Sequence, residues 1–217
     1  MIVAESERGN MPAVGDVSAE AGPRGQLPWY EFAHRFVRGK RVLDVGCGRG
    51  RGLRILQQAA ALAVGQDVDP RLAGPSVLIV DLEEIGTKTY DVVTAIDVVE
   101  HVEHPEPFVD HLGRIAREGV FVTTPNWTAS RCAWPYHLRE YTPREFTRLM
   151  ARLGPVTLFK GTPSGSIVHT VRHPVAYNTL NDLRTWAPTS VAALCLNLVL
   201  PSPYKIHSHN AAWVRLG

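Results

Sequence analysis

The sequence has little net charge, few cysteines and no long apolar run. Lys and Arg total 23 against 21 for Asp and Glu, and a formal net charge of +2 gives no reason to expect a nucleic-acid-binding groove. Three cysteines without paired spacing argue against a disulfide scaffold and against a structural zinc site. The longest apolar stretch, Val191–Leu200, is about half of the ~20 residues that a membrane-spanning helix needs.

The length of 217 residues fits one domain with an appended segment. No basic region followed by an apolar run opens the sequence, so we expect no secretory signal and a cytoplasmic protein. Residues 1–28 are mainly rich in Gly, Pro, Ala, Ser and acidic residues without periodicity, which predicts a flexible N-terminal arm. Residues 29–217 then form the domain, with a helical insertion at about 176–200 before the last strand.

Apolar runs alternate with segments of helical spacing along the rest of the chain. The expected strands are the run that ends at the glycines from 46 to 52, Ala61–Val68, Ser76–Leu82, Tyr90–Val98, Gly119–Thr124, Pro155–Lys160 and His209–Leu216. The expected helices are Trp29–Val37, Leu53–Leu62, Pro107–Arg117, Thr142–Leu153 and Tyr177–Leu200. This alternation predicts an α/β fold in which a doubly wound, mostly parallel sheet has helices on both faces.

One connection is too short for this pattern. Only Pro70–Ser76 separate the second expected strand from the third, whereas a crossover between parallel strands usually needs about a dozen residues or more. We therefore expect the second crossover helix to be shortened to a turn or lost.

Glycines at positions 46, 48, 50 and 52 follow the first expected strand. Such a turn lets the backbone approach a ligand and aims free N–H groups at it. The dinucleotide-binding fingerprint G-x-G-x-x-G fails, because Arg51 stands at its third glycine, and a nicotinamide-dependent dehydrogenase is thereby disfavoured. The spacing present is G-x-G-x-G, preceded by Asp44.

This segment resembles the first motif of the class I S-adenosyl-L-methionine (SAM)-dependent methyltransferases, and the resemblance continues in order over about residues 29–160. It implies a Rossmann-like fold with a seven-stranded sheet whose last strand is antiparallel. We expect His209–Leu216 to be this last strand and to return to the sheet edge. It also implies that Asp67 accepts hydrogen bonds from the ribose hydroxyls and that Asp81 meets the adenine amino group; the alternative is that both acids only form turns. The cofactor-binding residues that the resemblance implies are Asp44, Gly46, Cys47, Gly48, Gly50, Asp67, Val68, Asp81, Leu82 and Ile96.

The segment Asp97-Val98-Val99-Glu100-His101 resembles the E-x-x-E-H motif of two methyltransferase branches, the ubiquinone-biosynthesis O-methyltransferases and the small-RNA 3′-terminal 2′-O-methyltransferases. In the RNA enzymes a second histidine precedes a stretch similar to residues 140–146, and here that histidine is His137. The resemblance implies a divalent metal, with Mg²⁺ expected, bound by Asp97, Glu100, His101 and His137. Asp97 departs from the motif, because aspartate is shorter than the glutamate found there.

An alcohol is a poor nucleophile at neutral pH and needs a base or a metal, so Asp97, His101 and His137 are also the candidate catalytic residues. The alternative is that Glu100 and His101 shape the cavity without a metal and that His137 bonds to backbone. The remaining candidate histidines are expected to be surface or loop residues: His104, His169, His173, His207 and His209.

The sequence thus predicts a SAM-dependent O-methyltransferase acting on a hydroxyl of a small molecule, with or without a divalent metal. A sugar or oligosaccharide is the favoured acceptor, because the Thr124-Pro125-Asn126 segment and the His137–Pro143 segment resemble enzymes of glycan and natural-product pathways. Catechol-type methylation, 2′-O-methylation of RNA and a non-catalytic SAM-binding subunit remain alternatives. The near-neutral charge disfavours RNA. The apolar tail favours a homodimer.

Overall fold

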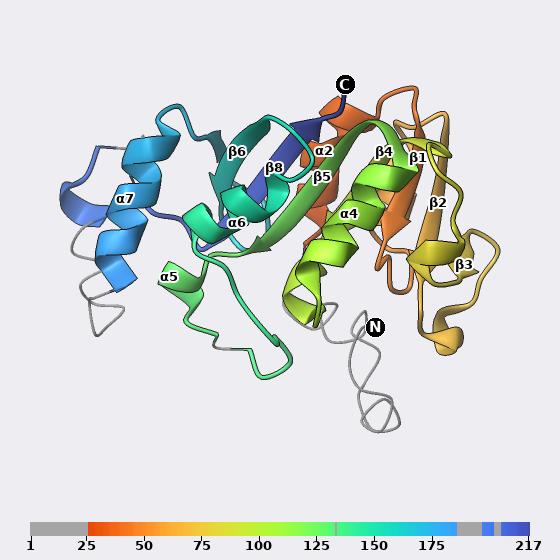
Figure 1. The fold of residues 1–217 in the computed structure, drawn as a ribbon, viewed down its shortest axis with the longest axis horizontal. Helices are drawn as coiled ribbons and strands as arrows, with labels where there is room; N and C mark the ends of the chain where they lie inside the picture. Colours follow the sequence, from red (N-terminus) through yellow and green to blue (C-terminus); the bar gives the residue numbers. More distant parts are fainter. Residues whose placement is uncertain (1–25, 133, 186–196, 202–204) are drawn as a thin grey trace.

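The structure is a computed structural model that describes residues 26–132, 134–185, 197–201 and 205–217. These residues form one eight-stranded sheet in the order β3-β2-β1-β4-β5-β8-β6-β7 (Figure 1). The pairs from β3 to β5 are parallel, whereas β8 is antiparallel to β5 and β6, and β7 is antiparallel to β6. The strands are β1 (Arg41–Val45), β2 (Leu62–Asp67), β3 (Val77–Ile79), β4 (Tyr90–Ile96), β5 (Ala116–Pro125), β6 (Val156–Gly161), β7 (Val168–Thr170) and β8 (His209–Arg215).

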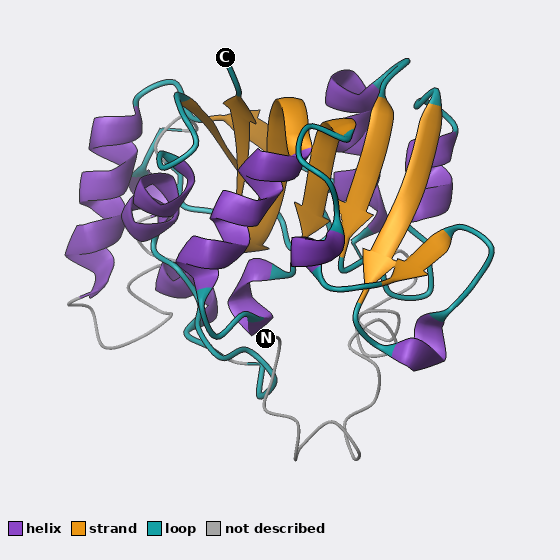
Figure 2. Cartoon of the chain, turned by 45° about the vertical axis from the view of Figure 1, so that its right-hand side comes forward, coloured by secondary structure: helices purple, strands orange, loops and turns teal. Residues whose placement is uncertain are grey.

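Helices cover both faces of the sheet (Figure 2). One apolar core lies between the sheet and α4 and α6, and a second lies between the sheet and α2 and α3. The α-helices are α2 (Leu27–Val37), α3 (Leu53–Gln57), α4 (Pro105–Ile115), α5 (Trp127–Ser130), α6 (Pro143–Met150) and α7 (Pro174–Thr185). The part of the chain that the structure describes also contains the short 3₁₀ turns η1 (Pro70–Leu72), η2 (Leu82–Glu84) and η3 (Val99–His101).

The doubly wound, mostly parallel fold is confirmed, but the sheet has eight strands instead of seven. The additional strand is β7, whose three residues pair with β6 and are too few to give a sequence pattern. The last strand does not return to the sheet edge, as we expected for His209–Leu216; it lies between β5 and β6. This interior position suits a strand that is apolar on both faces, and Ala211, Ala212 and Val214 are all fully buried.

The shortened second crossover is confirmed: between β2 and β3 the chain forms only the turn η1. The connection from β3 to β4 also contains only a 3₁₀ turn, η2. The helix expected at Leu53–Leu62 ends at Gln57, because β2 already begins at Leu62. With little chain on their outer side, β2 and β3 leave Leu62 and Leu78 exposed.

Two expected segments are only partly described. Residues 1–25 of the expected N-terminal arm lie outside the described residues, and the chain is described from Gln26 into α2. The expected insertion at 176–200 is described as α7 and as a short helical segment at 197–199, whereas 186–196 lie outside the described residues. In the described part of the chain, no helix has the length and apolar character needed to cross a membrane.

Helix α6 begins at the capping box that its sequence encodes. The Glu145 N–H donates to Thr142 Oγ1 over 3.2 Å, and the Thr142 N–H donates to Glu145 Oε2 over 2.9 Å.

Thr142→Ala is expected to lower the free energy of unfolding by about 1 kcal/mol, because it leaves an orphan N–H at the helix start. Urea denaturation measures the change. Thr179→Ala, at an exposed site in α7, is the control and should cause no loss; equal losses would contradict the capping role.

Candidate active site

The chain after β1 turns around three glycines that adopt left-handed backbone conformations. Their φ angles are 65° at Gly46, 54° at Gly48 and 70° at Gly50, which residues with a side chain rarely adopt. A Cβ at Gly46 would lie 2.6 Å from Val98 Cγ2, so glycine is also required for the close approach to the segment after β4. The turn therefore brings bare backbone to the carboxyl edge of the sheet.

Asp44 lies on β1 immediately before this turn and is fully buried. The Thr94 hydroxyl donates to Asp44 Oδ1 over 2.7 Å, whereas Asp44 Oδ2 has no hydrogen-bond partner. Burial raises the pKa of Asp44 to about 7 although the hydroxyls of Thr94 and Tyr30 act against the shift. A cationic ligand beside Oδ2 would favour the ionised carboxylate.

Asp67, at the end of β2, is bonded directly to the glycine turn. Its Oδ2 accepts from the Gly48 N–H over 3.0 Å, and its Oδ1 accepts from the N–H groups of Val68 and Asp69 over 2.8 and 3.1 Å. Burial raises its pKa although these N–H groups act against the shift. The carboxylate thus lies where the ends of β1 and β2 meet.

The other predicted cofactor residues lie along the same edge. Asp81 is exposed after β3 and caps η2, and the half-buried Leu82 follows it. Ile96 is buried at the end of β4. Cys47 is buried within the glycine turn, where burial raises the pKa of its thiol, in agreement with a spacing role and not a nucleophilic one. All ten predicted cofactor residues therefore follow or end the strands β1 to β4.

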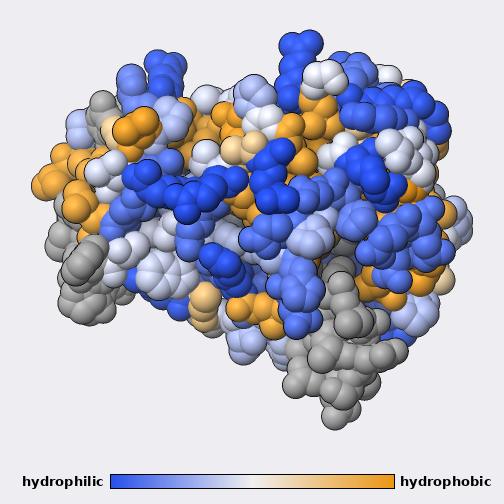
Figure 3. Space-filling model, viewed as in Figure 1, coloured by the Kyte–Doolittle hydropathy of each residue, from blue (hydrophilic) through white to orange (hydrophobic). Residues whose placement is uncertain are grey.

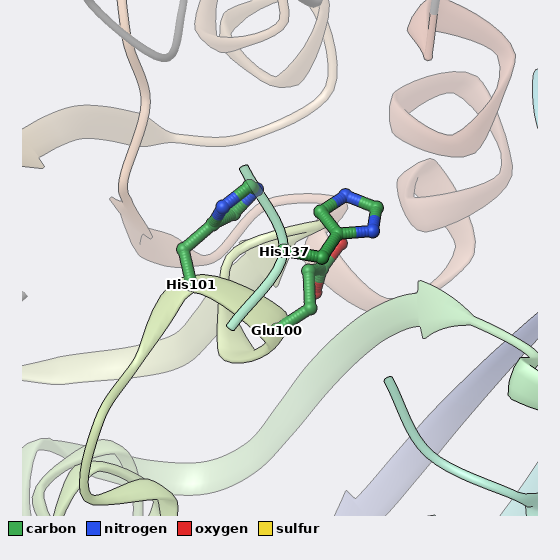
Figure 4. A group of neighbouring side chains, drawn as sticks. All are labelled: Glu100, His101 and His137. Atoms are coloured by element: carbon green, nitrogen blue, oxygen red, sulfur yellow. The ribbon is translucent and has the colours of Figure 1, made fainter. Parts of the chain in front are cut away.

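Next to this edge, Glu100, His101 and His137 converge (Figure 4). Each offers one ligand atom, and these atoms lie within 4.8 Å of one another. Glu100 and His101 come from η3, directly after β4, and His137 comes from the loop between α5 and α6. The structure thus brings together three of the four predicted metal ligands.

Both histidines are oriented through their Nδ1 atoms. Nδ1 of His101 lies 2.9 Å from the carbonyl oxygen of Tyr136, and Nδ1 of His137 lies 2.6 Å from Glu140 Oε1. Because both partners are acceptors, each ring donates from Nδ1 and keeps the lone pair of Nε2 for another ligand. Burial lowers the pKa of His101, which favours the neutral ring.

Glu140 is held in turn by Ser130 and Cys132. The Ser130 hydroxyl donates to Glu140 Oε2, and the Cys132 N–H donates to the same oxygen over 2.9 Å. Burial acts to raise the pKa of Glu140, but the hydrogen bonds from His137 and Ser130 hold it below its usual value. An ionised Glu140 that orients a histidine is the arrangement found behind many metal-binding histidines.

Glu100 is fully buried and only half satisfied. The Thr124 hydroxyl donates to Glu100 Oε2 over 3.1 Å, whereas Oε1 has no partner. Burial and the nearby negative charge of Asp97 raise the pKa of Glu100 well above its usual value. A cation at this position would remove the penalty of the buried carboxylate.

Asp97, the fourth predicted ligand, lies outside this group. Its backbone is left-handed, with φ of 53°, and its carboxylate accepts from Thr123 Oγ1 at 2.5 Å and from Gln26 Nε2 at 2.7 Å. His209 Nε2 lies 3.2 Å from Asp97 Oδ2. Burial acts to raise the pKa of Asp97, but the charge and hydrogen bond of His209 lower it below its usual value.

Sequence reasoning missed three of these functional neighbours. His209 was expected at the surface or in a loop, but it is buried at the start of β8 against Asp97. Gln26 belongs to the segment expected to be an arm, and neither residue carries a motif. Glu140 had a usable signal, because it follows His137 by three residues.

The fold and this edge define a class of protein. The protein has an α/β fold of the kind that binds a nucleoside-containing cofactor at the carboxyl ends of its strands. The features that indicate this are the strand order, the glycine turn after β1, the acids at the ends of β2 and β3, and the antiparallel strand beside β5.

Comparisons identify the family. A family model described as a methyltransferase domain matches residues 27–156. The ubiquinone biosynthesis O-methyltransferase of Mesorhizobium japonicum is 31% identical over 176 residues, covering 71% of this chain and 70% of that protein. The protein of that name from Paraburkholderia xenovorans is 33% identical over 118 residues, covering 46% and 50%. The chain belongs to the class I SAM-dependent methyltransferases.

Solved structures agree on the fold. A SAM-dependent methyltransferase from Archaeoglobus fulgidus matches with a TM-score of 0.55 at 20% sequence identity, over 97% of each chain. The chain spans about half the length of the first curated relatives that it matches, those from Paraburkholderia xenovorans and Bordetella bronchiseptica. SAM is the cofactor of the family, whereas the acceptor needs separate argument.

The raised pKa of Asp44 predicts how the stability of the SAM-free protein depends on pH. Between the unfolded value of 3.8 and the folded value of about 7, the folded state binds the extra proton, so stability falls as pH rises through this range. Asp44→Asn cannot ionise. The stability of this variant relative to the wild type should therefore rise by up to about 4 kcal/mol from pH 4 to pH 8.

Urea denaturation of both proteins without SAM at several pH values tests this prediction. Glu103→Gln, which removes an exposed carboxyl just after η3, is the control and should show no such divergence. A constant difference between Asp44→Asn and wild type across the range would contradict the assignment.

Proposed function

We propose that this protein is a SAM-dependent O-methyltransferase that methylates a hydroxyl of a small molecule held beside Glu100, His101 and His137. The convergence of these three side chains, next to the edge that carries the predicted cofactor residues, carries the proposal. SAM is already activated for methyl transfer, so the chain has to place the acceptor oxygen in line with the sulfonium and ease the loss of its proton.

The predicted cofactor residues along this edge of the sheet are proposed to bind different parts of SAM. Asp67 is proposed to bind the ribose hydroxyls, and the exposed Asp81 the adenine amino group. The unpartnered Oδ2 of Asp44 is an acceptor for a cationic part of SAM. The left-handed glycines leave room for the cofactor beside the backbone. The methyl group of SAM then lies near the end of β4 and points towards Glu100, His101 and His137, which we call the three-residue group.

A divalent cation fits the three-residue group. Glu100 Oε1 is a buried acceptor without a partner, and the Nδ1 bonds of both histidines leave Nε2 as the atom available to a cation. Two imidazoles and one carboxylate favour Zn²⁺ or Mn²⁺ over the Mg²⁺ that we expected from the four-residue motif. When bound, such a cation would lower the pKa of the acceptor hydroxyl and orient it.

A metal-free mechanism is the second candidate, and one hydrogen bond favours it. Because Glu140 fixes the Nδ1–H of His137, Nε2 of that ring is oriented as a proton acceptor. In this case Nε2 of His137 removes the hydroxyl proton, while Glu100 and His101 shape the pocket. The two candidates differ in their need for metal and agree on O-methylation.

The acceptor is proposed to carry adjacent hydroxyls, which suit the three converging polar side chains. A sugar or oligosaccharide was favoured by the sequence. The relatives, which are named ubiquinone biosynthesis O-methyltransferases, support O-methylation, and a catechol is the alternative acceptor. RNA is disfavoured by the net charge of +2. A homodimer and a cytoplasmic location remain predictions from the sequence.

Metal content and methyl transfer test the proposal together. The protein, as purified and after loading with Zn²⁺ or Mn²⁺, is incubated with methyl-labelled SAM and a panel of catechols, sugars and short RNAs, with and without EDTA. We expect label on a catechol or a sugar, lost with EDTA. Glu100→Gln should weaken metal binding by at least about 100-fold, since loss of a second-shell partner alone costs about 10- to 100-fold.

Glu103→Gln is the matched control, because Glu103 is exposed just after the same turn and makes the same change of charge. It should leave metal binding and transfer unchanged. Label that survives EDTA but is lost in His137→Ala supports the metal-free candidate. SAM binding with no label on any acceptor would favour the non-catalytic alternative and contradict the proposal.

A further inference from the structure

Helix α7 is folded with its polar side inward. The residues that it buries are Tyr177, Asn178, Asn181 and Arg184. Its exposed residues include Val175, which is 79% exposed, and Leu183, which is 65% exposed. Figure 3, drawn from the same side as Figure 1, shows apolar surface at the α7 end of the molecule. A helix that only stabilised the core would place these residues the other way round.

The buried polar atoms without a partner gather in two places. Eight such side-chain atoms occur in the described residues. Three belong to Asp44, Glu100 and His209 of the candidate active site. The other five lie on α7 or on β8 beside it: Tyr177 Oη, Asn178 Oδ1, Arg184 Nη1, and Oδ1 and Nδ2 of Asn210. Since buried polar groups are normally satisfied, the second group indicates a second part of the ligand.

Arg184 is the most informative member, because it is 3% exposed and carries a full charge. Burial lowers its pKa, and the positive charge of Arg131 lowers it further. Arg131 Nη2 donates to the carbonyl oxygen of Arg184 over 2.7 Å, which holds the two residues together. Within the described residues, no carboxylate forms an ion pair with the Arg184 guanidinium, and its Nη1 has no hydrogen-bond partner.

Two connections join this region to the three-residue group. Asn181 Oδ1 accepts from Asn126 Nδ2 and Thr128 Oγ1, which fixes α7 against α5. Directly after α5, Arg131 lies between Ser130 and Cys132, the two residues that hold Glu140 behind His137. The inward face of α7 and the histidines therefore depend on the same short segment.

The second connection crosses the sheet. Asn210 pairs with Thr124 of β5 on one side and with Lys160 of β6 on the other. Thr124 bonds to Glu100, and the Lys160 ammonium lies 5.2 Å from the centre of the Tyr177 ring. A polar row thus runs from Glu100 to α7 on one face of the sheet.

We propose that the inward face of α7 binds an anionic group of the acceptor, a carboxylate or a phosphate, with Arg184 as its main partner. This inference rests on the proposed function, because it places the methylated hydroxyl at Glu100, His101 and His137. A planar guanidinium binds carboxylate and phosphate through paired charge-assisted hydrogen bonds. The anion balances the buried charge, and Tyr177 and Asn210 contribute neighbouring hydrogen-bonding groups. The acceptor is therefore an acidic hydroxylated molecule.

Matched ligand pairs test the inference. Binding to the full chain saturated with S-adenosylhomocysteine is measured by calorimetry for 3,4-dihydroxybenzoate against 3,4-dihydroxybenzamide, glucuronate against glucose, and glucose 6-phosphate against glucose. At least one anionic member should bind at least about tenfold more tightly than its neutral partner. The benzoate and glucuronate pairs report a carboxylate, and the glucose phosphate pair reports a phosphate.

Variants assign the preference to one residue. Arg184→Gln should abolish the anionic preference while leaving the neutral member's affinity unchanged, and Arg184→Lys should retain part of it. Arg148→Gln, at an exposed position of α6, makes the same change of charge and should retain all of it. Arg184→Leu should raise the Tm of the ligand-free protein, because it removes a buried charge.

Binding separates this inference from the proposed function, which is judged by methyl transfer. An anionic preference without any transfer would support the anion site and count against the O-methyltransferase. Transfer without an anionic preference in any pair would overturn the anion site alone. Absence of binding by every anionic member, or a lower Tm of Arg184→Leu with unchanged preference, would also overturn it.

Discussion

The burial of carboxyl groups at one edge of the sheet is the constraint on which the site depends. Asp44, Asp97 and Glu100 are each at most 9% exposed, and in the described residues none forms an ion pair with Lys or Arg. An ionised carboxylate without compensation costs several kcal/mol to bury. Asp97 is compensated by three donors, whereas Asp44 and Glu100 each keep an unpartnered oxygen. The edge is therefore suited to positively charged ligands, and SAM carries such charge.

The alternation of side chains along β5 explains why the two acids after β4 have separate roles. Thr123 and Thr124 are adjacent and so point to opposite faces of the sheet. Thr123 bonds to Asp97 on the α2 side, and Thr124 bonds to Glu100 on the side of α4 and α6. The left-handed conformation at Asp97 and its short side chain fix this separation. Glutamate at this position would have the reach that aspartate lacks.

A local pattern was sufficient to predict the glycine turn, because its glycines stand at fixed spacing next to a strand end. The role of Asp67 beside it and the group of Glu100, His101 and His137 came from the resemblance to known methyltransferase motifs, since His137 lies in the loop between α5 and α6. The features that were missed depend on contacts between distant segments: His209 meets Asp97 from 112 residues away. The position of β8 between β5 and β6 is of the same kind. The sequence of a strand of small apolar residues is compatible with the edge of a sheet and with its interior. Only the packing on both faces of the strand decides between these two positions.

The polarity of α7 connects stability with binding. Its inward Arg184 and Tyr177 retain unpartnered atoms, while its apolar Leu183 is exposed, so this helix by itself stabilises the fold less than an ordinary amphipathic helix would. A ligand that binds only the folded state returns this stability, by an amount that grows with the logarithm of its concentration relative to its Kd. The same reasoning holds for Asp44 and Glu100. If both proposals hold, the unpartnered groups in all three places have one explanation: the cofactor, the acceptor hydroxyl and the acidic group of the acceptor would each supply partners that the protein itself does not provide.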